Sequence, residues 1–194
     1  KRLASYGVSV VVNAIQDREA ADAVAHDIFE SGGKALAHIA DVTDEDAVNK
    51  MMKTAVKAFG SVDILICNAS LRAQKDFQEI TVEEWQRTIA VTLDGAFFCT
   101  RAAAPHMIKN RWGRIIGLGG MSSNLGMAKR LHVLAAKAGL VGMMRGLATE
   151  LAPHNITCNI VAPGHIETDR PKSAGPRPSA GTSPPINRLG DVEE

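Results

Sequence analysis

Aromatic residues, charge of one sign and long apolar runs are all scarce in this sequence of 194 residues. Phe, Trp and Tyr make up only 4% of it, which suits a sheet covered by small-residue helices better than an aromatic-rich β-sandwich. The net charge of +1 and the lack of a basic run argue against a nucleic-acid surface. Without a signal-peptide pattern or an unbroken apolar run of ~20 residues, we expect no membrane segment.

Cysteine is also rare. Cys67, Cys99 and Cys158 all lie in apolar segments, and an odd number of buried thiols favours neither disulfides nor a metal site. We therefore predict no metal and a reducing, cytoplasmic compartment.

Apolar, β-branched segments alternate with segments of helical periodicity. We predict strands at residues 8–13, 34–41, 62–67, 115–118 and 156–161, and helices at 17–31, 92–110 and 132–152, with one more between Thr43 or Asp44 and Gly60. A capping box at Thr81 opens a further helical stretch. This alternation indicates a single α/β domain with a parallel sheet and right-handed crossovers.

Several short motifs follow one another in a specific order. They are Asp41-Val42, Asn68-Ala69-Ser70, Gly113-Arg114-Ile115-Ile116, the helix around Lys137, residues 147–152, and the run from Asn159 through Pro163-Gly164 to Thr168. In this order the chain resembles the short-chain dehydrogenase/reductase family, in the branch similar to 3-oxoacyl-[acyl-carrier-protein] reductases. The resemblance covers residues 1–194 and implies a Rossmann-like, doubly wound parallel sheet in three α/β/α layers.

The resemblance also implies where a dinucleotide would lie. Asp41 and Val42 would flank the adenine, Asn68, Ala69 and Ser70 would line its path, Lys137 would hold the nicotinamide ribose, and Pro163, Gly164, Ile166 and Thr168 would surround the nicotinamide. Small residues at a strand end let a ligand approach the backbone, and a lysine donates to ribose hydroxyls. The plain alternative for Lys137 is an exposed helix lysine.

The end of the 8–13 strand bears on cofactor choice. An acidic residue there would accept from the ribose 2′-hydroxyl of NAD. Asn13 stands at this strand end instead, with Arg18 nearby. We therefore predict NADP, with NAD possible.

The resemblance implies two elements that residues 1–194 do not supply. A first strand and its glycine-rich phosphate loop would precede Lys1, with that strand between those at 8–13 and 62–67, and a last strand would follow. We expect a domain incomplete at both ends. For a chain that starts at Lys1, strong dinucleotide binding is not expected, because the pyrophosphate loses its helix N-terminus.

Three of the family's four catalytic positions carry other residues. Its tyrosine lies four residues before the lysine, on the same helix face, where the ammonium lowers the tyrosine pKa. Val133 stands at that position, Gly120 at the serine position and Thr92 at the asparagine position, so only Lys137 remains. A missing proton donor and carbonyl polariser would slow carbonyl reduction by several powers of ten.

Neighbouring residues offer substitutes. His132 has a suitable pKa but lies about 100° round the helix from the tyrosine position; its alternative is a polar residue at a helix start or interface. Ser122 and Ser123 are alternatively loop or cap groups, and His165 is alternatively a residue of the pocket wall.

Residues 171–185 are rich in proline, glycine and serine, which predicts an active-site lid or a disordered loop. This segment would shape the pocket of a small-molecule substrate. In the family, helices like 92–110 and 132–152 form a four-helix interface, so we expect a homodimer or homotetramer. Three functions stay open: an NAD(P)-linked oxidoreductase, a catalytically impaired nucleotide-binding or scaffold relative, and a non-redox enzyme on the same fold.

Overall fold

The predicted α/β architecture is confirmed by a computed structural model, which describes residues 1–121, 125–168 and 188–192. The five strands within these residues all pair in parallel. They are β1 (Val10–Ala14), β2 (Ala35–Ile39), β3 (Ile64–Cys67), β4 (Gly113–Leu118) and β5 (Ile156–Val161). Each lies within two residues of its predicted bounds.

Several helix ends agree with the capping residues predicted from the sequence. The helices are α1 (Arg2–Ser5), α2 (Arg18–Glu30), α3 (Glu45–Phe59), α4 (Val82–Ile89), α5 (Gly95–Asn110) and α7 (Leu131–Leu151). The carboxylates of Asp17 and Asp44 accept backbone N–H groups at the starts of α2 and α3. Gly60 ends α3 with a φ of 91°, a conformation that costs glycine little.

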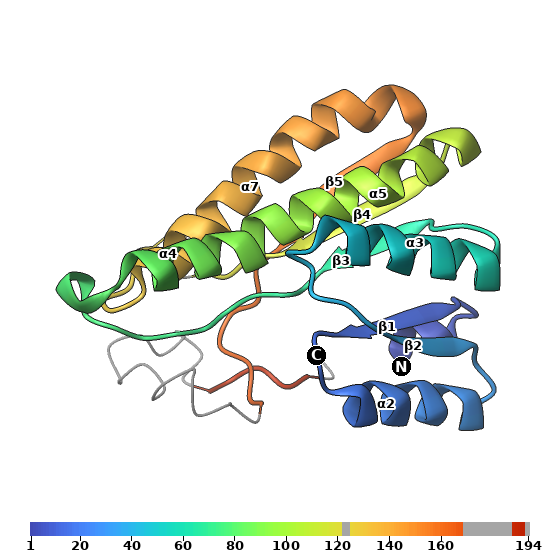
Figure 1. Cartoon of the computed structure of the whole chain (residues 1–194), viewed down its shortest axis with the longest axis horizontal. Helices are drawn as coiled ribbons and strands as arrows, with labels where there is room; N and C mark the ends of the chain where they lie inside the picture. The colour runs from blue at the N-terminus through green and yellow to red at the C-terminus, as the bar shows by residue number, and fades with distance from the viewer. Residues whose placement is uncertain (122–124, 169–187, 193–194) are drawn as a thin grey trace.

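Helices cover the strands from both sides (Figure 1). α3, α5 and α7 lie side by side along one face, whereas α2 packs on β1 and β2 from the other. Fully buried Met107, Ile115 and Leu140 form the middle of the core between the strands and α5 and α7. Leu131–His154 is long and apolar enough to cross a membrane by length and composition alone, but Leu140 and Met144 in this stretch belong to the core.

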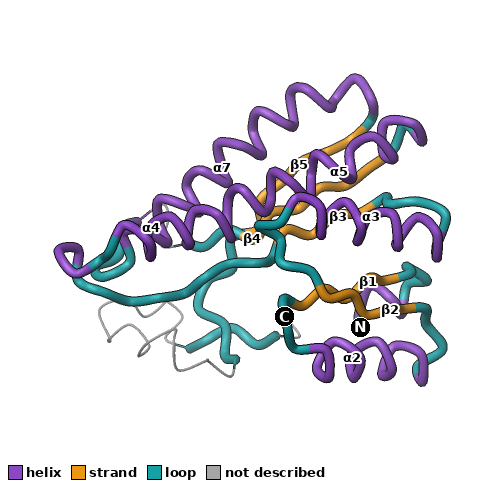
Figure 2. The backbone as a smooth tube through the Cα atoms, in the orientation of Figure 1, coloured by secondary structure: helices purple, strands orange, loops and turns teal. Residues whose placement is uncertain are grey.

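The strands form two separate sheets, as Figure 2 shows. One has the order β1-β2 and the other β3-β4-β5. Between β1 and β3 lies a cavity of about 730 Å³.

Candidate functional site

Lys137 lies on α7, beside the carboxyl end of β4. Its Nζ donates to the backbone oxygen of Leu118, the last residue of that strand. Burial lowers the pKa of Lys137 to about 8, and the positive charge of Arg72 acts in the same direction. The lysine is therefore held near the strand ends, with its charge easily lost in weakly alkaline solution.

The position one helical turn before Lys137 has no ionisable group. Val133 is buried there, with 7% of its surface exposed. Gly120 follows β4 in the loop and brings no side chain. Neither Val133 nor Gly120 has a side chain that can donate a proton or a hydrogen bond.

Thr92 lies in a π-helical turn, η2 (Ala90–Asp94), that joins α4 directly to α5. The sequence prediction began a helix at Thr92 and did not predict this turn, which makes residues 82–110 one continuous helical run. The buried Thr92 hydroxyl lies 3.1 Å from the hydroxyl of Ser70, just beyond β3. Because β3 and β4 are parallel, this hydroxyl pair and Lys137 lie at the same end of the sheet. π-Helical turns occur often at functional sites.

His132 is buried at the start of α7, and its Nδ1 has no hydrogen-bond partner among the described residues. Burial lowers its pKa, and the negative charge of Glu84 on α4 partly opposes that shift. The charge that acts on Lys137 comes from Arg72 instead. The structure thus places the two predicted catalytic residues in different electrostatic surroundings, with His132 at the contact between α4 and α7.

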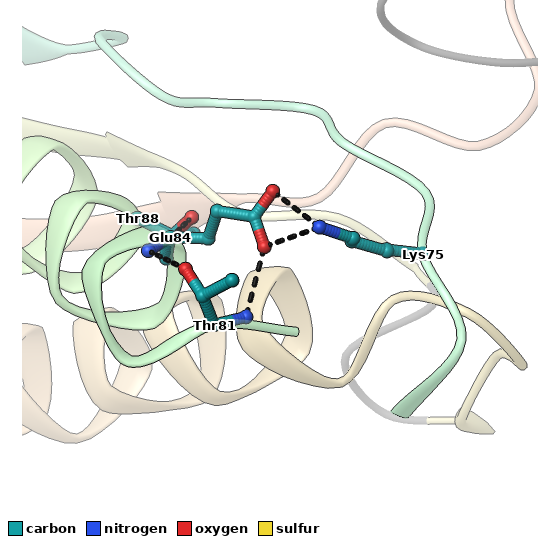
Figure 3. Close-up of polar contacts among 4 residues, drawn as sticks. All are labelled: Lys75, Thr81, Glu84 and Thr88. Atoms are coloured by element: carbon teal, nitrogen blue, oxygen red, sulfur yellow. Dashed lines mark hydrogen bonds and ion pairs between the residues drawn. The ribbon is translucent and has the colours of Figure 1, made fainter. Parts of the chain in front are cut away.

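Glu84 is fixed by a set of polar contacts at the start of α4, drawn in Figure 3. Its carboxylate accepts from the backbone N–H of Thr81, while the Thr81 hydroxyl accepts from the backbone N–H of Glu84. This is the predicted capping box. Both carboxylate oxygens also lie 2.7 Å from Nζ of Lys75, so the negative charge that acts on His132 is already paired.

The predicted adenine side of the site is built around Asp41, after β2. Its carboxylate accepts from the backbone and hydroxyl of Thr43 and from the guanidinium of Arg87 at 3.0 Å. Burial raises the pKa of Asp41, but these hydrogen bonds outweigh it and leave the pKa below its usual value. On β1, the Asn13 amide donates to the backbone oxygens of His38 and Ala40, joining the two strand ends.

Four of the predicted cofactor residues line the cavity between β1 and β3: Asn13, Val42, Asn68 and Ala69. The other seven predicted cofactor residues do not line it: Asp41, Ser70, Lys137, Pro163, Gly164, Ile166 and Thr168. Ile166 instead forms an isolated parallel bridge with Gly190, and the His165 backbone oxygen accepts from the N–H of Gly190. Ser122, Ser123 and the predicted lid at 171–185 lie outside the described residues.

The described part of the chain holds no group of three His, Cys, Asp or Glu residues that could bind a metal ion. Burial raises the pKa of Cys67 to about 12 and that of Cys99 to about 11. These thiols are therefore protonated at neutral pH and carry no nucleophilic charge.

Comparison with known proteins places this geometry in context. The family described as "short chain dehydrogenase" matches residues 1–178. A 3-oxoacyl-[acyl-carrier-protein] reductase of Synechocystis sp. is 37% identical over 192 residues, which are 99% of this chain and 77% of the relative. The (2S)-[(R)-hydroxy(phenyl)methyl]succinyl-CoA dehydrogenase subunit BbsD of Thauera aromatica is 40% identical over 167 residues, 86% of this chain and 66% of the relative.

Among solved structures, the crystal structure of an NAD+-bound xylitol dehydrogenase superposes with a TM-score of 0.89 at 25% identity. The superposition covers 98% of this chain and 80% of the dehydrogenase chain. The agreement supports the same strand and helix arrangement that the sequence predicts.

Proposed function

This chain belongs to the short-chain dehydrogenase family, and we propose that it is an NAD(P)-linked oxidoreductase with an atypical active site. One observation carries the proposal: Lys137 Nζ is held at the carboxyl end of β4 by the Leu118 backbone oxygen. A ligand of a parallel α/β sheet binds beyond this end of the strands. Its substrates would be small carbonyl compounds or alcohols.

The residues around the strand ends fit a dinucleotide. Asn13, Asn68 and Ala69 share one cavity and offer short side chains and amide groups to a polar, elongated ligand. Lys137 would donate to ribose hydroxyls. The bound nicotinamide would supply or accept the hydride.

We propose NADP as the preferred dinucleotide. Asn13 offers no carboxylate to a ribose 2′-hydroxyl, and Arg18 begins α2 just beyond β1. The only described carboxylate of the predicted adenine side, Asp41, is already bonded to Arg87. The similar xylitol dehydrogenase is NAD+-bound, so NADH belongs in every assay.

The proton for such a reaction would come from water or from the substrate, because Val133 has none to give. Loss of a side-chain acid costs about 10²–10⁴-fold in rate. We therefore expect slow turnover with a small carbonyl substrate rather than rates usual for the family.

An NADPH titration by nicotinamide fluorescence, on protein of verified intact mass, tests this proposal. We expect saturable binding that Lys137→Met weakens about tenfold or more, the loss expected for a charged hydrogen-bond donor. Lys53→Met, on the exposed side of α3, is the matched control and should bind as the original chain does. An absence of binding to both NADPH and NADH would rule the proposal out for this chain.

A second candidate, a catalytically impaired nucleotide-binding relative, is favoured by the buried Val133. The double variant Val133→Tyr with Gly120→Ser separates the two. Reductase activity at least about 10²-fold above the original chain would mean that the remaining site is competent. Nucleotide binding without any gain of activity would favour the impaired relative.

We further propose that α5 and α7 pair with a second copy. Phe97 on α5 is 47% exposed, and an added Cβ at Gly142 or Gly146 on α7 would meet no atom within 4 Å. Such an open, small-residue face lets two helices approach closely. Sedimentation analysis should find a dimer or tetramer that Gly142→Arg converts to a monomer.

A further inference from the structure

Arg87 on α4 reaches across to the turn that follows β2. Its guanidinium donates to Oδ2 of Asp41 at 3.0 Å and to the hydroxyl of Thr43, also at 3.0 Å. The backbone N–H and the hydroxyl of Thr43 in turn donate to Oδ1 of Asp41. These four hydrogen bonds hold the Asp41 carboxylate at both of its oxygens and join the turn to a helix that is distant in the sequence.

The same turn contacts the helical run 82–110 at a second point. Val42 lies against Gly95, the first residue of α5. An added Cβ at Gly95 would lie 2.6 Å from the Val42 side chain and 3.3 Å from its backbone oxygen, so only glycine allows this close approach. The helical run therefore fixes both Asp41 and Val42, the two residues predicted to flank the adenine.

The carboxylate of Asp41 can accept one further hydrogen bond. Each oxygen of an ionised carboxylate can accept about two hydrogen bonds. The described residues donate two to Oδ1 of Asp41 and one to Oδ2. The side chain is 30% exposed, so a ligand can still reach Oδ2. This acceptor suits an N–H donor such as the amino group of adenine, because a hydrogen bond to a charged oxygen is stronger than one to a neutral oxygen.

The two ends of a dinucleotide would contact different elements of the fold. Asp41 follows β2, whereas Lys137 lies on α7. α4 packs against α7 (Figure 1), and Arg87 on α4 bonds to Asp41. A continuous series of contacts therefore connects the helix of Lys137 to the Asp41 carboxylate. A ligand that binds at both ends needs them held in a fixed relative position, which hydrogen bonds behind the contacting residues provide.

We propose that Arg87 is a positioning residue for the adenine half of the dinucleotide and acts by fixing the Asp41 carboxylate. This role rests on the oxidoreductase function proposed above. Without Arg87, the bonds from Thr43 would hold Asp41 at one oxygen only, and Oδ2 would be free to turn toward water. Asp41 would then have to be ordered each time the nucleotide binds, and ordering a side chain on binding lowers affinity.

Two probes separate the two halves of the dinucleotide. NADPH carries both halves, whereas reduced nicotinamide mononucleotide carries only the nicotinamide half, and nicotinamide fluorescence reports the binding of either. Arg87→Met keeps an apolar side chain but loses both donors. It should weaken NADPH binding about tenfold and leave binding of the mononucleotide unchanged. Arg87→Lys can donate to Asp41 but lacks the planar fork that reaches both partners, so its NADPH affinity should fall between the two.

Arg101→Met is the matched control. Arg101 on α5 forms an ion pair with Glu45 on α3 at 3.2 Å, so this variant also removes one arginine–carboxylate contact and one positive charge. It leaves the hydrogen bonds of Asp41 in place, and NADPH binding should not change. A loss of affinity that comes only from the change in net charge would appear in both variants.

A double variant tests whether Arg87 acts through Asp41. Asp41→Ala alone should weaken NADPH binding about tenfold. Adding Arg87→Met to it should cause no further loss, because the carboxylate that Arg87 holds is gone. If Arg87→Met weakened NADPH binding by the same factor with and without Asp41, Arg87 would act on the nucleotide by another route and the proposal would be wrong.

Circular dichroism of each variant shows whether it folds. If Arg87→Met does not fold, Thr43→Val tests the same arrangement, because it removes an acceptor of Arg87 and a donor to Asp41. Unchanged NADPH binding in both variants would overturn the role of Arg87 alone. An equal loss of both probes would overturn it too, since it would mark a purely structural ion pair. No binding of NADPH or NADH by the original chain would instead overturn the oxidoreductase function, and this role with it.

Discussion

The two sheets of this protein show how neighbours, rather than composition, decide the burial of a strand. β4 pairs on both sides, and its residues alternate between buried and half-buried, with Ile115 completely buried. β1 is as apolar, reading Val-Val-Val-Asn-Ala, yet none of its residues is buried. The difference is that β1 has β2 on one edge and the cavity on the other.

Shortening one side chain in each sheet should give the largest difference in the free energy of unfolding. We expect Ile115→Ala to lower the free energy of unfolding by about 2–5 kcal/mol, because it leaves a hole in a closed core. Val11→Ala removes a half-buried side chain beside an existing cavity and should cost about 1 kcal/mol. Urea denaturation followed by circular dichroism measures both, and equal losses would mean that β1 is packed as tightly as β4.

Substituting alanine for glycine tests the same comparison by adding a methyl group instead of removing side-chain atoms. An added Cβ at Gly117 on β4 would lie 2.7 Å from Ile160, so Gly117→Ala should cost about 1–3 kcal/mol through overpacking. Gly142→Ala is the control, because its Cβ would meet no atom of the same copy and alanine favours a helix by about 0.5–1 kcal/mol; both variants are compared at a concentration where the chain is monomeric. A destabilised Gly142→Ala variant would contradict this account of the open face of α7.

The cap of α4 should have a smaller effect. Thr81→Ala removes the hydroxyl that accepts from Glu84 and should cost about 1 kcal/mol. Thr54→Ala in α3 is the matched control, because the Thr54 hydroxyl caps no helix end and donates to the backbone oxygen of Lys50 within the helix. Thermal unfolding of both variants checks the difference, which should vanish if the capping box is not formed in solution.

The smallest expected effect is the contribution of His132 to the pH dependence of folding stability. Burial lowers its pKa in the folded chain, so below the ordinary value of 6.5 the unfolded chain binds more protons. Stability should therefore fall as pH falls from about 6.5 toward the lowered pKa. His132→Asn should flatten this fall.

Lys137 gives a separate test in alkaline solution. Its folded pKa of about 8 lies below the ordinary 10.5, so between these values the unfolded chain binds more protons and stability should rise with pH. Lys137→Met should remove this rise. A fall in stability across the same range, in both proteins, would contradict a buried, easily neutralised lysine.

Most of the fold could be predicted from the sequence because its signals are local. Asp44 and Gly60 bound α3, and the Thr81 capping box opens α4, each through contacts within a few residues. The π-turn at Ala90–Asp94 could not be predicted, since it shares its composition with the α-helices on either side. What distinguishes it is packing around Thr92, which sequence periodicity does not contain.

The site could be predicted only in part. Asn13, Asn68 and Ala69 line one cavity, although Asn13 lies far along the chain from the other two. The contact between Ser70 and Thr92 depends on how η2 passes the end of β3, and the pairing of Glu84 with Lys75 depends on a loop fold. No spacing rule predicts either contact, because each joins segments that only the folded chain brings together.

The division between β1-α2-β2 and the rest has a consequence for motion as well. Strands that share no hydrogen-bond ladder need not open together, so the chain has two units that can unfold locally with different free energies. Backbone amides of β1 and β2 should then exchange with solvent deuterium well before those of β4. The order of exchange would reveal the boundary between the two sheets without any structure determination.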